Sequence, residues 1–150
     1  MSCLACEAQA PGGRILETPG WIVEHTVGSL GVGTLIVKTR RHVLHVGDLT
    51  DDEAAELGPL LRRVAAAVSE IAKPSQVYVC LWSHENRQPG HIHFVIQPVS
   101  RELMNDLDAH GPRLQVALFD RGEPPDPDAA AAFAARAREL LAREEAVTTP

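Results

Sequence analysis

Runs of apolar and β-branched residues, separated by turn-forming residues, predict five strands. They are Arg14–Glu17, Trp21–Thr26, Thr34–Thr39, Gln76–Trp82 and His91–Gln97. Thr18-Pro19-Gly20 predicts a turn between the first two strands. Two stretches rich in Gly or polar residues, 27–33 and 83–90 (SHENRQPG), predict loops.

A long helix is predicted between the third and fourth strands, because apolar residues recur there at spacings of three and four. Thr50 and Glu53 have the spacing of a capping box at its start. Pro59 is expected to bend or locally break the first turns, since it lacks a backbone N–H. The helix should end near Lys73-Pro74.

The last third of the chain predicts two more helices and one strand candidate. Arg101–Ala109 favours a short helix, and Leu114–Phe119 favours a strand. The alanine-rich run from Asp128 to about Glu145 predicts a second long helix, with Asp126 as its N-cap. Strands, one helix and two more strands fit an α+β fold with an antiparallel sheet. We expect a single domain over residues 1–150, with a core at about 3–98 and a C-terminal extension at about 99–150.

Composition and charge narrow the function classes. The 150 residues suit one domain, and the net charge of −6 argues against sequence-independent binding of nucleic acid. The basic run of Lys38, Arg40, Arg41 and His42 is interpreted as a solvated strand end. No apolar run is long enough to span a membrane, and the first residues do not resemble a signal peptide. We therefore expect a cytoplasmic protein without a membrane partner.

The motif His91-Ile92-His93 lies on the last predicted strand, where side chains alternate between faces. The expected core-facing residues are Ile92, Phe94 and Ile96, and those sharing the other face are His91, His93, Val95 and Gln97. Gly90 directly before the motif allows a ligand to approach the backbone closely. The alternative interpretation is a polar strand face exposed to solvent.

Three cysteines, an odd number, argue against a disulfide framework. Cys3 and Cys6 form a Cys-x-x-Cys pair, and with two histidines they would supply the four ligands of a closed zinc site. Four such ligands argue against an open, catalytic zinc. The alternative is a pair of thiols in an irregular N-terminus.

Several segments resemble the histidine-triad superfamily of nucleotide hydrolases and transferases. HIHFVIQP resembles its His-φ-His-φ-His-φ-φ signature, in which φ is apolar. GTLIVKTRRH followed by DLTDDEAAEL is similar to the strand ending in a basic-basic-His sequence and the first helix of the family. CLAC resembles the Cys-x-x-Cys of zinc-containing members. The resemblance covers roughly residues 3–98 and is strongest to the bacterial diadenosine-polyphosphate-hydrolase-like branch.

The resemblance implies a five-stranded antiparallel sheet, with the main helix after the third strand, and a homodimer. It implies that His93 is the nucleophile toward a nucleotide α-phosphate and that His91 supports the site. It also implies that zinc is held by Cys3, Cys6, His42 and His91. His45 is the main alternative to His42 as a ligand.

The resemblance has one departure, because Val95 stands where the third histidine contacts the transferred phosphate. Valine cannot donate a hydrogen bond. The candidate phosphate-binding residues are Ser83, His84, Asn86, Gln88 and Gln97.

The expected function is hydrolysis or transfer of a nucleotidyl group through a nucleotidyl-histidine on His93. The expected substrate is a dinucleoside polyphosphate or a nucleoside phosphoramidate. The alternatives are a non-catalytic nucleotide-binding or regulatory protein and a zinc-stabilised interaction module.

Overall fold

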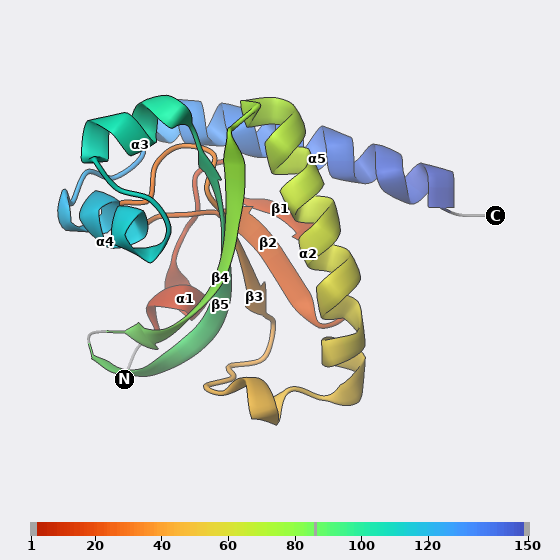
Figure 1. The fold of residues 1–150 in the computed structure, drawn as a ribbon. Helices are drawn as coiled ribbons and strands as arrows, with labels where there is room; N and C mark the ends of the chain where they lie inside the picture. The colour runs from red at the N-terminus through yellow and green to blue at the C-terminus, as the bar shows by residue number, and fades with distance from the viewer. Residues whose placement is uncertain (1–2, 86, 149–150) are drawn as a thin grey trace.

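Five antiparallel strands form one sheet in the computed structural model, which describes residues 3–85 and 87–148. The strands are β1 (Arg14–Glu17), β2 (Trp21–His25), β3 (Leu35–Thr39), β4 (Gln76–Glu85) and β5 (Gln88–Val99). Their order is β1-β2-β3-β5-β4, so β1 and β4 are the edges. Helices lie on both faces of the sheet (Figure 1). The predicted α+β fold with a five-stranded antiparallel sheet is confirmed.

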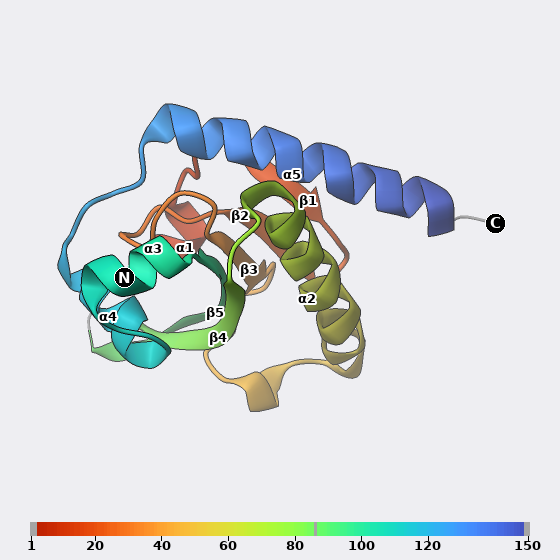
Figure 2. The same ribbon diagram turned by 45° about the horizontal axis from the view of Figure 1, so that its top comes forward.

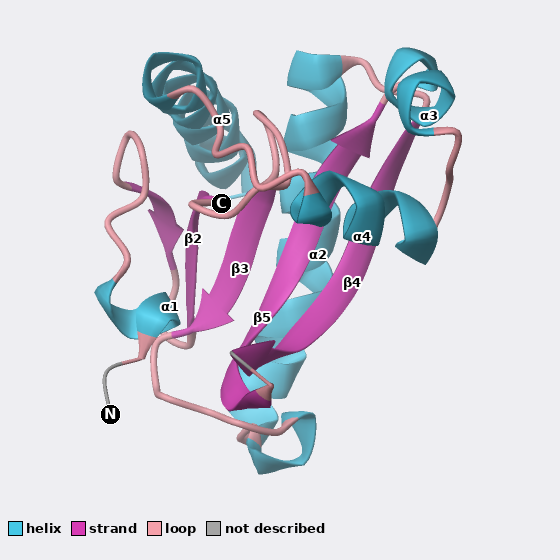
Figure 3. Cartoon of the chain, turned by 90° about the vertical axis from the view of Figure 1, so that its left-hand side faces the viewer, coloured by secondary structure: helices cyan, strands magenta, loops and turns pink. Residues whose placement is uncertain are grey.

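The β4–β5 hairpin is longer than the sequence predicts. Residues 83–85 and 88–90 continue the two strands, with Glu85 paired to Gln88 and a register shift between Trp82 and His84. The prediction of a loop at 83–90 is therefore wrong for residues 83–85 and 88–90. A two-stranded ribbon is held by backbone hydrogen bonds, so it can form from polar residues that show no apolar alternation. The ribbon extends past the other strands beside α1 (Figure 3).

The main helix, α2 (Asp51–Ala72), begins with the predicted capping box. The Thr50 side chain accepts from the Glu53 N–H, and the Glu53 carboxylate accepts from the Thr50 N–H. The helix continues through Pro59, so the expected local break is not present. Pro59 and Ala55, whose carbonyl would have accepted the missing N–H, are both exposed, so water can solvate that carbonyl. The short 3₁₀ helix η1 (Val46–Asp48) precedes α2.

The C-terminal helix, α5 (Pro127–Thr148), packs on α2 and β1 (Figure 2). Its predicted N-cap is confirmed, because the Asp126 carboxylate accepts from the Ala129 N–H at 2.9 Å. Ala134, Ala137 and Leu141 belong to the same core cluster as the sheet and α2. The segment expected to be an extension thus supplies part of the core.

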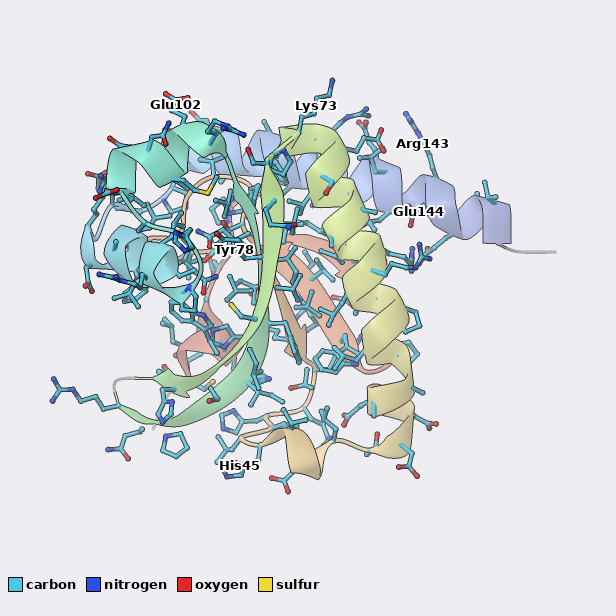
Figure 4. The ribbon with its side chains drawn as sticks, viewed as in Figure 1. His45, Lys73, Tyr78, Glu102, Arg143 and Glu144 are labelled. Atoms are coloured by element: carbon cyan, nitrogen blue, oxygen red, sulfur yellow. The ribbon has the colours of Figure 1, made fainter. Side chains whose placement is uncertain are left out.

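The opposite face of the sheet carries α1 (Leu4–Glu7), α3 (Arg101–Leu107) and α4 (Pro112–Asp120) (Figure 3). The prediction of a strand at Leu114–Phe119 is wrong, because this segment forms α4. A short apolar run does not distinguish a strand from a helix by periodicity alone. Tyr78 extends from β4 toward α4 (Figure 4), where its hydroxyl accepts from the Gly111 N–H at 2.8 Å. No helix in the described residues has the length and apolar character needed to cross a membrane.

Candidate functional site

The two histidines of the β5 motif lie on the sheet face opposite the main core. Ile96 belongs to the core cluster and Phe94 packs against it, as the alternation predicts. On the other face, His91 is 3% exposed and His93 is half-buried. This face is covered by protein, so the alternative of a solvated polar strand face does not hold.

The short helix α1 brings the Cys-x-x-Cys pair to the histidines. The ligand atoms of Cys3, Cys6, His42 and His91 all lie within 4.8 Å of one another. The Cys6 Sγ atom lies 3.3 Å from His91 Nδ1 and 3.6 Å from His42 Nδ1, and the Cys3 Sγ atom lies 3.9 Å from His91 Nδ1. A tetrahedral zinc bound to sulfur and nitrogen sets such atoms about 3.3–3.8 Å apart. The donor set suits one zinc ion, and both Cys6 distances lie in this range. The Cys3 to His91 distance of 3.9 Å is slightly longer, so small side-chain movements would complete the tetrahedron.

Hydrogen bonding prepares His91 to act as a metal ligand. Its Nε2 atom lies 2.7 Å from the Thr39 hydroxyl, so Nε2 can carry the proton and Nδ1 can face the two sulfur atoms unprotonated. Burial, with the nearby His42, lowers the pKa of His91 to about 4, which keeps the ring neutral. Partial desolvation and the neighbouring Cys3 raise the pKa of Cys6 to about 11, so metal binding must displace a proton from this thiol. His45 lies on the exposed loop before α2 and is not in the cluster (Figure 4).

The second histidine of the motif has a defined tautomer. The backbone carbonyl of His91 lies 2.9 Å from Nδ1 of His93 and accepts a hydrogen bond from it, so Nδ1 carries the proton. The Nε2 atom of His93 is then the nitrogen with a free lone pair. His93 lines a pocket, so this lone pair belongs to a residue that a ligand can reach.

The pocket has a volume of about 240 Å³. Residues of α1, β2, β3, the β4–β5 hairpin and α4 line it, together with the loop after β2. Trp82 and Phe119 form an edge-to-face pair on one wall, with ring centroids 5.4 Å apart. Both an apolar ring system and polar groups of a ligand therefore find matching surfaces in it.

A buried ion pair forms part of the same pocket. The Lys38 ammonium group donates to the Glu24 carboxylate and to the backbone carbonyl of Ala5, and Lys38 is only 5% exposed. The interpretation of the basic run as a solvated strand end is wrong for Lys38, although Arg40 and Arg41 are exposed. Glu24 is paired with Ile36 and Lys38 with Ile22, so the two charges are diagonal neighbours on adjacent strands. Opposite charges on two predicted neighbouring strands are the sequence signal that could have identified this pair.

The predicted phosphate-binding residues divide into two groups. His84 lines the pocket, whereas Ser83, Gln88 and Gln97 do not. Gln97 is completely buried, and its side chain bonds to the Leu30 carbonyl and to Gln115. Asn86 lies outside the described residues. The pocket lining also includes Glu24, Lys38, Trp82 and Phe119, which sequence reasoning did not place in the site.

Comparison with known proteins reveals similarity at the level of structure only. No protein-family profile and no curated protein sequence matches the chain. A Zn-bound histidine triad family protein from Mycobacterium smegmatis aligns over 97% of both chains, with a TM-score of 0.65 and 19% identity. A histidine triad protein from Bradyrhizobium japonicum aligns over 85% of this chain and 89% of its own, with a TM-score of 0.67 and 22% identity. A hypothetical histidine triad nucleotide-binding protein from Sulfolobus tokodaii aligns over 88% and 85%, with a TM-score of 0.64 and 13% identity.

The five-stranded antiparallel sheet with its flanking helices agrees with the fold of these similar structures. The chain has the fold of the histidine-triad proteins.

Proposed function

We propose that the protein is a histidine-triad nucleotide hydrolase or nucleotidyl transferase in which His93 is the nucleophile. The observation that carries this proposal is the hydrogen bond from Nδ1 of His93 to the His91 carbonyl, which leaves Nε2 as the free nitrogen of a pocket residue. The proposed substrates are dinucleoside polyphosphates and nucleoside phosphoramidates. Within the family, we assign the chain to the bacterial diadenosine-polyphosphate-hydrolase-like branch.

The reaction has two steps. In the first, the Nε2 lone pair of His93 bonds to the α-phosphorus while the bond from phosphorus to the leaving phosphate oxygen or amine nitrogen breaks, and the leaving group takes a proton. In the second, water bonds to the same phosphorus and loses a proton, and the bond to Nε2 breaks, releasing the nucleotide. The carbonyl of His91 stabilises the positive charge that His93 carries in the intermediate, because it accepts a hydrogen bond from the Nδ1–H group.

Val95 limits the rate of this chemistry. Its side chain is completely buried and does not line the pocket, so it offers nothing to the phosphate. His84 lines the pocket and is the predicted residue best placed to donate instead. A missing donor at an oxyanion costs about 2.7–4 kcal/mol of transition-state stabilisation, so we expect slow turnover.

Zinc has a structural role in this proposal. Cys3, Cys6, His42 and His91 would hold the ion, which bound by four protein ligands supplies stability and no open coordination position. The similar Mycobacterium smegmatis structure is described as Zn-bound, which supports the assignment.

A second candidate function is binding of nucleotides without hydrolysis, for regulation. The same burial of Val95 favours it, because the pocket then has a nucleophile but no donor at the third position of the signature. Binding without turnover would distinguish it from the enzyme.

We also propose a homodimer. The apolar side chains of α2 are covered by the sheet and α5, so the helix does not provide the interface that its long apolar pattern suggests. The edge strand β4 exposes Val79 and Leu81, at 44% and 38%, and offers both unpaired backbone groups and apolar surface.

The cysteines are free thiols, which suits the reducing cytoplasm.

The test of the proposed reaction compares the parent protein with His93→Ala. Turnover of adenosine phosphoramidate and diadenosine tetraphosphate should be lost in the variant, while binding of adenosine monophosphate is partly retained. Rapid-quench mass spectrometry of the parent should detect an adenylyl adduct on His93. His110→Ala is the matched control, because His110 is exposed and does not line the pocket. Equal turnover by His93→Ala and the parent would refute the covalent mechanism.

A further inference from the structure

The single-turn helix α1 belongs to two sites at once. Cys3 and Cys6 direct their sulfur atoms to the metal cluster. Leu4, Ala5 and Ala8, which alternate with them in the sequence, line the ligand pocket. Whatever holds α1 in place therefore shapes a wall of the pocket.

Polar contacts join α1 to the sheet. The helix has only four residues and buries none of them. One helical turn is not stable by itself in water. Its described contacts to the body are the bonds from Lys38 to the Ala5 carbonyl and from the Leu4 N–H to the Glu85 carboxylate, the latter at 2.7 Å, and the approach of its cysteines to His42 and His91.

Lys38 contacts both α1 and the pocket lining. Its ammonium group is shared between the Glu24 carboxylate, which lines the pocket, and the carbonyl of Ala5, which lies between the two cysteines. A buried ammonium group needs its partners, because an unpaired charge is costly to desolvate. When α1 leaves the sheet, Lys38 loses one acceptor and the pocket loses a wall.

We propose that Lys38 is a positioning residue that couples the metal cluster to the ligand pocket, so that the pocket is complete only when metal holds α1 against the sheet. The identity of the ligand as a nucleotide rests on the proposed function. The coupling between the metal cluster and α1 does not depend on the proposed function. By thermodynamic linkage, if zinc raises the affinity for the ligand, the ligand raises the affinity for zinc by the same factor.

The first experiment needs no variant. Hydrogen exchange of the parent protein, without nucleotide, should show the amides of Glu7 and Ala8 protected with zinc and rapidly exchanging after chelation, because these amides bond within α1. Calorimetry with adenosine monophosphate should show binding about 5- to 150-fold tighter with zinc than without it. Equal protection of α1 in both states would overturn the proposal.

The second experiment isolates Lys38. In Lys38→Met, zinc should still bind through its four ligands. The ratio of the adenosine monophosphate affinities of the zinc-loaded and zinc-free protein should fall toward one. The amides of α1 should also exchange faster than in the zinc-loaded parent. Lys73→Met is the matched control, because Lys73 is exposed at the far end of α2 (Figure 4). An unchanged zinc effect on affinity and unchanged exchange in Lys38→Met would refute the role of Lys38.

The outcomes separate this inference from the proposed function. If no nucleotide binds in any state while α1 still responds to zinc and to Lys38→Met, the proposed function fails and the coupling of α1 to the metal stands. If nucleotide binds equally with and without zinc, the nucleotide-binding part of the proposed function stands and the coupling fails.

Discussion

The carboxylate of Glu53 joins the start of α2 to the segment that carries His42. It accepts hydrogen bonds from Arg41 at 3.0 and 2.9 Å and from the Thr50 N–H at 2.9 Å. The bond to Arg41, followed by the bond to the Thr50 backbone, lowers the pKa of Glu53 from 4.5 to about 2. We predict that Glu53→Gln destabilises the protein at neutral pH, because glutamine keeps the shape but removes the charge.

The size of the effect follows from the pKa. A fall from 4.5 to about 2 corresponds to about 3 kcal/mol in favour of the folded state with an ionised Glu53. Half of the Arg41 side chain is exposed, at 50%, so water screens part of this attraction. We therefore expect a loss of about 1–2 kcal/mol in the free energy of unfolding at pH 7.

The sign of the pH dependence is defined. Because the pKa is lowered in the folded protein, the contribution of Glu53 is complete above pH 4.5 and is lost as the pH falls toward 2. Urea unfolding followed by circular dichroism, with chelator present to remove metal effects, should show the parent and Glu53→Gln converging between these two values. Glu70→Gln, an exposed position on the same helix, should match the parent at every pH. A Glu53→Gln deficit that is as large at pH 2.5 as at pH 7, or absent at pH 7, would refute this reasoning.

Further expectations concern the metal, the third position of the signature and the assembly. Protein purified without chelator should contain about one zinc per chain by elemental analysis, and Cys3→Ser should lose most of it; unchanged metal content would exclude the cluster. Val95→His should lower the free energy of unfolding by about 2–4 kcal/mol in urea titrations and should not accelerate turnover. The reason is that a larger polar ring replaces a completely buried valine paired with Ile36 and Cys80. A stable variant with faster turnover would contradict the observed burial. Light scattering at micromolar concentration should report a dimer that Leu81→Lys weakens, and a monomeric parent would exclude it.

Local patterns in the sequence predicted most of the fold. Hydrogen bonds between near neighbours set the capping box of Thr50 and Glu53 and the N-cap at Asp126. The two-residue repeat of an extended backbone sets the alternation along β5, so all three can be recognised without a tertiary structure. The same reasoning failed at Leu114–Phe119, where a short apolar run is compatible with a strand or a helix.

The site depended on contacts between distant segments. The cysteines were recognisable as soft ligands, but only the docking of α1 on the sheet brings Cys6 within 3.3 Å of His91. Lys38 looked like a solvated charge because its partners, Glu24 and the carbonyl of Ala5, are far away in the sequence. Gln97 is not available to a phosphate, because its side chain accepts a hydrogen bond from Gln115. Gln115 lies on α4, the segment for which the sequence predicts a strand. Hydrogen bonds and ion pairs across the sheet decide which polar residues reach the pocket, and their partners are chosen by tertiary packing rather than by sequence spacing.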